Sequence, residues 1–255
     1  GNFAGKAGMS EALFKFTGAC LGHRKGGVAM AAIGACAGFG AICGSSLATA
    51  ATMGKVALPE LRRLGYSGAL STGTLAAGGT LGILIPPSVI LIIYSILTEQ
   101  NIAKMFLAAF IPGILAALGY ILAIALYVRF VKDSGPTKDR VGWKERLSLF
   151  KNIWQIILIF LVMIGGIYLG WFTPTEGGAI GAGGAGLIAI SNKNFKFKDL
   201  VEVIESTAIT SAMIFLVLLG AEFFNSFIAL TQLPNQLGEI APVSYTHLTL
   251  PTSYP

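Results

Sequence analysis

Residues 78–88, Gly-Gly-Thr-Leu-Gly-Ile-Leu-Ile-Pro-Pro-Ser, constrain the fold of this chain more than any other stretch. They interrupt an apolar run that would otherwise form a single membrane helix. The three glycines lower helix stability, and Pro86 and Pro87 lack the amide hydrogen that an interior helical residue donates. The sequence therefore predicts a broken helix over residues 67–98.

A helix break at membrane depth has consequences for the backbone. Freed amide and carbonyl groups find no water in hydrocarbon, so a break is tolerated only where it is buried in protein or lines a wet cavity. Many secondary transporters build their ion and substrate sites from such breaks. A proline kink with packing glycines is the simpler alternative, but the density of glycine, proline and hydroxyl residues in this stretch favours a binding site.

Composition places the chain in a membrane. Of its 255 residues, 54% are hydrophobic and only 12% are charged, and the mean hydropathy is +0.74. A soluble domain carries about twice that charged fraction. The apolar runs are too long and continuous for alternating strands, so the predicted fold class is an all-α polytopic membrane protein. The net charge of +6 does not indicate a nucleic-acid partner, because the basic residues gather in loops between apolar runs, as the positive-inside rule expects.

A second interrupted run, residues 26–58, consists mainly of glycine and alanine and is broken at residues 43–46. Cationic segments flank it at residues 23–25 and 59–63, so both ends are predicted to be cytoplasmic. Each arm has about 15 residues, fewer than the roughly 20 that a full crossing needs. The pattern predicts a re-entrant helical hairpin with its tip near the bilayer midplane.

The predicted tip contains Gly44, Ser45 and Ser46. Hydroxyl and carbonyl oxygens are the ligands that hard cations prefer, and the N-terminus of the second arm favours an anion such as a carboxylate. The alternative is that the two serines only cap that arm. Together with the broken helix, the binding-site interpretation is favoured.

The remaining segments complete the predicted organisation. Residues 1–21 have the pattern of an amphipathic helix, and residues 105–131 form a helix that returns to the cytoplasmic side. A basic loop over residues 132–152 is predicted to be cytoplasmic, and residues 153–241 to contain further transmembrane helices. Within the last part, a turn at residues 172–177 separates two expected crossings.

Glu176 follows Thr173 at the spacing of a capping box around Pro174. A helix cap is therefore the favoured interpretation of Glu176, and a buried carboxylate that binds an ion is the alternative.

Residues 243–255 have neither membrane hydrophobicity nor a helical period, and they are expected to be a non-native tail. The chain opens in mid-pattern without an initiator methionine or signal peptide, so it is expected to be a fragment. Outside that tail the only histidine is His23, in a basic loop, which leaves an intramembrane enzyme without an obvious nucleophile–base pair. A channel-like or structural subunit is a further alternative.

Three motifs together resemble the large membrane subunit, of the DctM type, of tripartite ATP-independent periplasmic (TRAP) transporters. They are residues 44–50, residues 79–88 and residues 172–176, and the resemblance covers about residues 1–241. It implies sodium-driven import of small organic anions, such as C4-dicarboxylates or sialic acids, across the bacterial inner membrane. It also implies an elevator-type fold, a periplasmic substrate-binding protein and a small membrane subunit as partners, and contact with membrane lipid.

By position, residues 1–131 resemble the first part of the family's transport unit. The residues at the hairpin tip and the unwound helix resemble one sodium site and one wall of the substrate cavity: Gly44, Ser45, Ser46, Thr49, Gly79, Thr80, Gly82, Pro86, Pro87 and Ser88. Among these, the resemblance implies Na⁺ binding by Ser45, Ser46, Gly79, Thr80 and Gly82. Thr175 and Glu176 are weaker candidates. No cofactor other than the coupling ion Na⁺ is expected. The additional N-terminal helices and the second half of the family pattern, with its second hairpin and sodium site, are not in this sequence.

Overall fold

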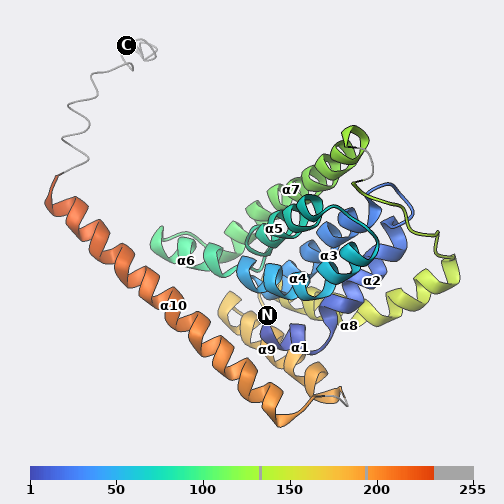
Figure 1. Ribbon diagram of the computed structural model, residues 1–255. Helices are drawn as coiled ribbons and strands as arrows, with labels where there is room; N and C mark the ends of the chain where they lie inside the picture. Colours follow the sequence, from blue (N-terminus) through green and yellow to red (C-terminus); the bar gives the residue numbers. More distant parts are fainter. Residues whose placement is uncertain (132–133, 193–194, 233–255) are drawn as a thin grey trace, which may run out of the picture. The chain divides into compact units, whose positions relative to one another are not determined.

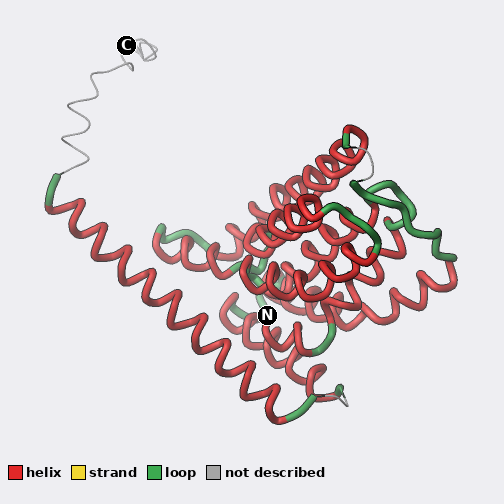
Figure 2. The backbone as a smooth tube through the Cα atoms, in the orientation of Figure 1, coloured by secondary structure: helices red, strands yellow, loops and turns green. Residues whose placement is uncertain are grey.

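The computed structural model describes residues 1–131, 134–192 and 195–232, and within these residues every regular element is a helix (Figures 1 and 2). Two compact units divide the chain, Gly1–Leu200 and Val201–Pro255. The ten helices are α1 Asn2–Lys6, α2 Met9–Leu21, α3 Gly27–Cys43, α4 Ser46–Arg63, α5 Gly68–Leu84, α6 Val89–Leu97, α7 Ile102–Phe130, α8 Trp143–Tyr168, α9 Pro174–Ser191 and α10 Phe197–Leu230. The all-α membrane fold class expected from the sequence is therefore confirmed.

Only some of these helices are long and apolar enough to cross a membrane. Among the described residues, α7, α8 and α10 are each long and apolar enough to cross a membrane. The pair α5 and α6 also qualifies when it is counted as one span bent by 45°. Helix α9 has 18 residues but is not apolar enough to join them, so a second crossing after residue 177 stays a prediction.

The predicted break in the apolar run of residues 67–98 is present. Helix α5 ends at Leu84, α6 begins at Val89, and the bend lies at the proline pair. The interrupted run at residues 26–58 likewise forms a helical hairpin, in which α3 ends at Cys43 and α4 starts at Ser46. Its arms have 17 and 18 residues, somewhat more than the about 15 expected, and α4 is longer than its share of the apolar run because it continues through Pro59 to Arg63.

Both ends of the hairpin are tied to one short segment. The amide of Gly26 donates to the carbonyl of Gly135 at 3.0 Å, and the amide of Ser67 donates to the carbonyl of Ser134 at 3.1 Å. The hydroxyl of Tyr66 accepts from the amide of Val28 and donates to the carbonyl of Pro136. The hairpin thus begins and ends at the same end of the bundle, as its cationic flanks predict.

Two segments differ from the expected boundaries. Residues 1–21 form two helices instead of one, because Gly8 adopts a left-handed conformation with φ of 76° between α1 and α2. Helix α8 begins at Trp143, inside residues 132–152, which were expected to be a loop. The last part of that stretch has apolar residues at helical spacing, and Phe150 packs its ring 5.8 Å from that of Phe16 on α2.

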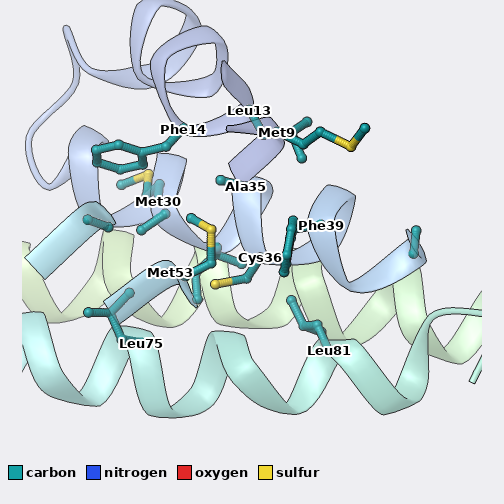
Figure 3. Packing of buried hydrophobic residues seen from close by; sticks show 14 of the residues in the cluster. Met9, Leu13, Phe14, Met30, Ala35, Cys36, Phe39, Met53, Leu75 and Leu81 are labelled. Carbon is teal, nitrogen blue, oxygen red and sulfur yellow. The ribbon is translucent and has the colours of Figure 1, made fainter. Parts of the chain in front are cut away.

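The core of the first unit lies around α3 and α5. Helix α5 packs against α3, α4 and α7, and α2 packs against α3 and α8. Figure 3 shows the buried side chains of Cys36, Phe39 and Met53 meeting Leu75 and Leu81 of α5. Glycines allow this close approach: a Cβ added to Gly40 would lie 2.8 Å from the Cα of Gly82.

This packing predicts that Gly40→Ala destabilises the protein. The added methyl group would meet the backbone of α5, which cannot move aside as a flexible side chain could, so the expected cost is about 1–3 kcal/mol. The measurement is thermal unfolding of the detergent-solubilised full-length subunit. Gly73→Ala on α5 is the matched control, because a Cβ there meets nothing within 4 Å. Equal loss of melting temperature in both variants would contradict the packing argument.

Glu60, at the end of α4, accepts hydrogen bonds from Arg63 at 2.8 Å and from Lys138 at 3.4 Å. The bond from Arg63, with a smaller contribution from Lys138, lowers the pKa of Glu60 below its ordinary value of 4.5. A carboxyl group with a lowered folded-state pKa stabilises the fold above the unfolded pKa and loses this contribution as the pH falls through the folded value.

We therefore expect Glu60→Gln to lower the melting temperature slightly at neutral pH and to match the wild type well below pH 4.5. Thermal unfolding in detergent across that pH range measures the difference. Arg62→Gln is the control, since Arg62 makes no such pair among the described residues. A constant difference between wild type and Glu60→Gln at every pH would refute the prediction.

Candidate binding site at the hairpin tip

The hairpin tip is formed by a glycine and a helix cap. Gly44 ends α3 in the left-handed conformation, with φ of 66°, and its amide donates to the carbonyl of Gly40. Ser45 follows in an extended conformation and caps α4 by accepting from the amide of Ala48 at 3.4 Å. The sequence left open whether the two serines only cap α4, and Ser45 does cap it. The carbonyl oxygens of Ser45 and of the half-buried Ser46 lie near glycines of α5.

The break between α5 and α6 contains Ile85, the cis peptide bond of Pro86–Pro87, and Ser88. It lies against the hairpin tip. The amide of Val89, which starts α6, donates to the carbonyl of Gly44 at 3.2 Å. A Cβ on Gly44 would lie 2.8 Å from the carbonyl oxygen of Pro87. The two non-helical segments, far apart in the sequence, are thus joined by a backbone hydrogen bond.

Below the tip, two candidate glycines of α5 face α4. A Cβ on Gly82 would lie 2.5 Å from the hydroxyl oxygen of Thr49 and 2.6 Å from the carbonyl oxygen of Ser45. A Cβ on Gly79 would lie 2.7 Å from the Cβ of Ala50 and 3.4 Å from the carbonyl oxygen of Ser46. Only glycine fits at these positions, and the absence of side chains brings oxygens of α4 close to the backbone of α5.

Two hydroxyls beside the tip have no hydrogen-bond partner. Thr49 is fully buried and Ser88 is 1% exposed, yet neither Thr49 Oγ1 nor Ser88 Oγ bonds to another described residue. A buried unpartnered hydroxyl costs about 1–3 kcal/mol, so such groups call for an explanation. A threonine hydroxyl in a helix commonly bonds to the carbonyl one turn earlier, alongside the backbone amide. Here the carbonyl of Ser45 accepts the amide of Thr49 at 3.0 Å, but the Thr49 hydroxyl makes no such bond.

Thr80 differs from the other candidates. Its hydroxyl donates to the carbonyl of Ala77 at 2.7 Å and lies 3.0 Å from the hydroxyl of Tyr120 on α7. The side chain therefore bonds toward α7, whereas Gly79 and Gly82 face α4. Tyr120 was not among the residues singled out from the sequence, because a tyrosine within the long apolar helix α7 carries no distinguishing pattern.

Glu176 acts as a helix cap. Its carboxylate accepts from the amide of Thr173 at 2.7 Å and from the Thr173 hydroxyl at 2.9 Å, and its own amide donates to that hydroxyl at 3.3 Å. The capping box expected from the spacing is confirmed. Thr175 is exposed beside it in the first turn of α9.

The chemistry of the tip is that of neutral oxygen donors. Within the described residues no group of three or more histidine, cysteine, aspartate or glutamate side chains is placed to hold a metal ion. Hydroxyls and backbone carbonyls remain, which suit a hard monovalent cation better than a transition metal. The capped N-terminus of α4 adds a positive electrostatic potential at the same place.

The chain matches the family described as "Tripartite ATP-independent periplasmic transporter, DctM component" over residues 1–247. The structure does not describe residues 243–255, which were expected to be non-native, although the family match extends through residue 247. Because this match covers nearly the whole chain, it identifies the family directly.

Three curated relatives illustrate the range of the family. The C4-dicarboxylate TRAP transporter large permease protein DctM of Pseudomonas aeruginosa is 35% identical over 93% of this chain and 55% of its own length. The sialic acid TRAP transporter permease protein SiaT of Haemophilus influenzae is 34% identical, over 91% of this chain and 38% of its own length. The ectoine TRAP transporter large permease protein TeaC of Halomonas elongata is 29% identical, over 89% of this chain and 53% of its own length.

The chain spans about half the length, or less, of these relatives. Its helices include several that can cross a membrane, and the family consists of transporter permeases, not enzymes. The chain belongs to the DctM family of TRAP transporter large permeases, as a multi-pass protein of the bacterial inner membrane.

Proposed function

We propose that this chain is part of the large subunit of a sodium-coupled secondary transporter that imports a small organic anion across the inner membrane. In this proposal a periplasmic substrate-binding protein delivers the anion and a small membrane subunit completes the transporter. The names of the relatives support an organic solute as substrate, since they include C4-dicarboxylate, sialic acid and ectoine.

The observation that carries the proposal is the pair of buried, unpartnered hydroxyls of Thr49 and Ser88 beside the hairpin tip. Neither is accessible to water, so a dehydrated cation is the simplest partner that would satisfy such oxygens. The carbonyl oxygen of Ser45 and the hydroxyl of Thr49 both border the space where Gly82 has no side chain, so this carbonyl would supply a further oxygen. We assign the ion to the oxygens of Ser45, Thr49 and Ser88, in the space beside Gly82 where a side chain is absent. The Thr80 hydroxyl is not part of this ion site, because it already bonds to Ala77 and Tyr120.

The same geometry supports binding of an anion beside the cation. The N-terminus of α4 favours a carboxylate, and a bound Na⁺ would strengthen this attraction. In this proposal the ion therefore contributes to substrate binding, and coupling follows because each ligand raises the affinity for the other.

The link between tip and break also supports motion of the two segments as one body. A hydrogen bond joins Val89 to Gly44, and glycine contacts interlock α5 with both arms of the hairpin. A re-entrant placement of the hairpin and an elevator-type movement are the form of transport that we propose for such a unit.

The proposal predicts that Thr49→Val in the full-length subunit raises the Na⁺ concentration for half-maximal uptake. Valine preserves the shape and removes the oxygen, and we expect about a tenfold increase, equivalent to the loss of roughly 1.4 kcal/mol of ion binding. The measurement is uptake of radiolabelled organic anion into proteoliposomes that contain both membrane subunits, with the binding protein added. Accumulation against the gradient that depends on Na⁺ also distinguishes a transporter from a channel.

Two matched variants sharpen this test. Thr80→Val removes a hydroxyl that already has two partners, and Thr72→Val removes an exposed one bonded to the carbonyl of Gly68. Both should leave the Na⁺ dependence near that of the wild type. If Thr49→Val behaves like Thr72→Val, the assigned ion site is wrong.

A further inference from the structure

A second site is suggested by a cavity of about 630 Å³ between α2, α4 and α8, apart from the hairpin tip. Its wall is partly apolar, with Phe14, Val56 and Leu149 from the three helices. Charged side chains complete the wall. A cavity of this size is large enough for a small ligand, and its mixture of apolar and charged surface is that of a site for an amphiphile.

The charges that line this cavity nearly cancel. Four cations and three carboxylates contribute to it: Lys15, Lys55, Arg63, Lys138, Glu11, Glu60 and Glu145. Lys15 pairs with Glu11 at 2.6 Å, and Arg63 and Lys138 both pair with Glu60. Within the part of the chain that the structure describes, Lys55 and Glu145 form no salt bridge or hydrogen bond. One cation and one anion, on α4 and α8, therefore remain available to a ligand.

The position of the cavity along α8 corresponds to a membrane interface. Glu145 and Leu149 lie in the sequence between Trp143 and Trp154, which are 82% and 54% exposed. Exposed tryptophans favour the headgroup level of a bilayer, and the basic residues nearby indicate the cytoplasmic leaflet. A ligand in this cavity would thus lie where phospholipid headgroups are found.

We propose that this cavity binds the headgroup of an inner-leaflet phospholipid that carries both a phosphate and a primary ammonium group. Lys55 would bind the phosphate and Glu145 the ammonium, while the first methylene groups of the acyl chains contact Phe14, Val56 and Leu149. A zwitterion fits better than a free anion, because the lining offers both a cation, Lys55, and a carboxylate, Glu145, outside the salt bridges of the cavity wall. This inference does not depend on the proposed ion site.

The test uses the full-length subunit, delipidated in detergent and examined by native mass spectrometry. Three probes are added in turn: phosphatidylethanolamine, phosphatidylglycerol and free phosphoethanolamine. We expect Lys55→Gln to reduce binding of both lipids about tenfold, and Glu145→Gln to reduce only that of phosphatidylethanolamine, because phosphatidylglycerol has no ammonium group. Lys55→Arg should retain binding of both lipids.

Arg62→Gln is the matched control, since Arg62 is an exposed cation on α4 outside the cavity. Size-exclusion profiles and melting temperatures show whether each variant is folded, and Lys55→Arg provides a second, conservative substitution at the same position. Unchanged lipid binding in both Lys55→Gln and Glu145→Gln would overturn the proposal, as would an equal loss in Arg62→Gln. Free phosphoethanolamine binding as tightly as the lipid would also overturn it, in favour of a soluble phosphate ligand.

Discussion

Backbone polar groups that are freed in the middle of a membrane protein need partners from the protein itself, and the structure around the hairpin tip depends on this requirement. The proline pair leaves the start of α6 without a preceding helical turn. The carbonyl of Gly44, which the end of α3 would otherwise leave unpaired, accepts the amide of Val89. The break before α6 thus supplies a hydrogen-bond donor to the hairpin tip, and the tip supplies the acceptor, so that each segment pairs a backbone group of the other.

Close approach of the helices makes this pairing possible. Gly40, Gly79 and Gly82 remove side chains where α3, α4 and α5 meet, so backbone and hydroxyl oxygens come within reach of one another. In hydrocarbon, apolar side chains gain little by leaving lipid, and packing of small residues becomes a main source of helix association. The glycines therefore serve the fold first, and the buried, unpartnered oxygens at the tip follow from the same packing.

The sequence was sufficient for the fold class, the break at Pro86 and Pro87, and the hairpin turn at Gly44, because prolines, glycines and long apolar runs act locally. It was also sufficient for the cap formed by Thr173 and Glu176, whose spacing is specific. The direction of the Thr80 side chain was not predictable. Helix α5 is rich in glycine, alanine and threonine on all sides, so no apolar stripe indicates which face meets α4 and which meets Tyr120. The split at Gly8 follows from the left-handed conformation of that glycine, which the amphipathic pattern of residues 1–21 does not reveal. Helix α8 begins at Trp143 because apolar residues continue at helical spacing into a stretch whose basic residues indicated a loop.

The segment of residues 134–138 bonds to Gly26 and Ser67, at the two feet of the helical hairpin, and Lys138 adds a bond to the carbonyl of Gly22. A hairpin that is bonded to the same segment at both ends resists pivoting about its base. Rotation of an arm away from this segment would break the backbone hydrogen bond at its own base, whereas translation of both arms together with the segment breaks neither bond. The bonds between residues 134–138 and the base of the hairpin thus favour displacement of the whole hairpin with this segment over rotation of one arm.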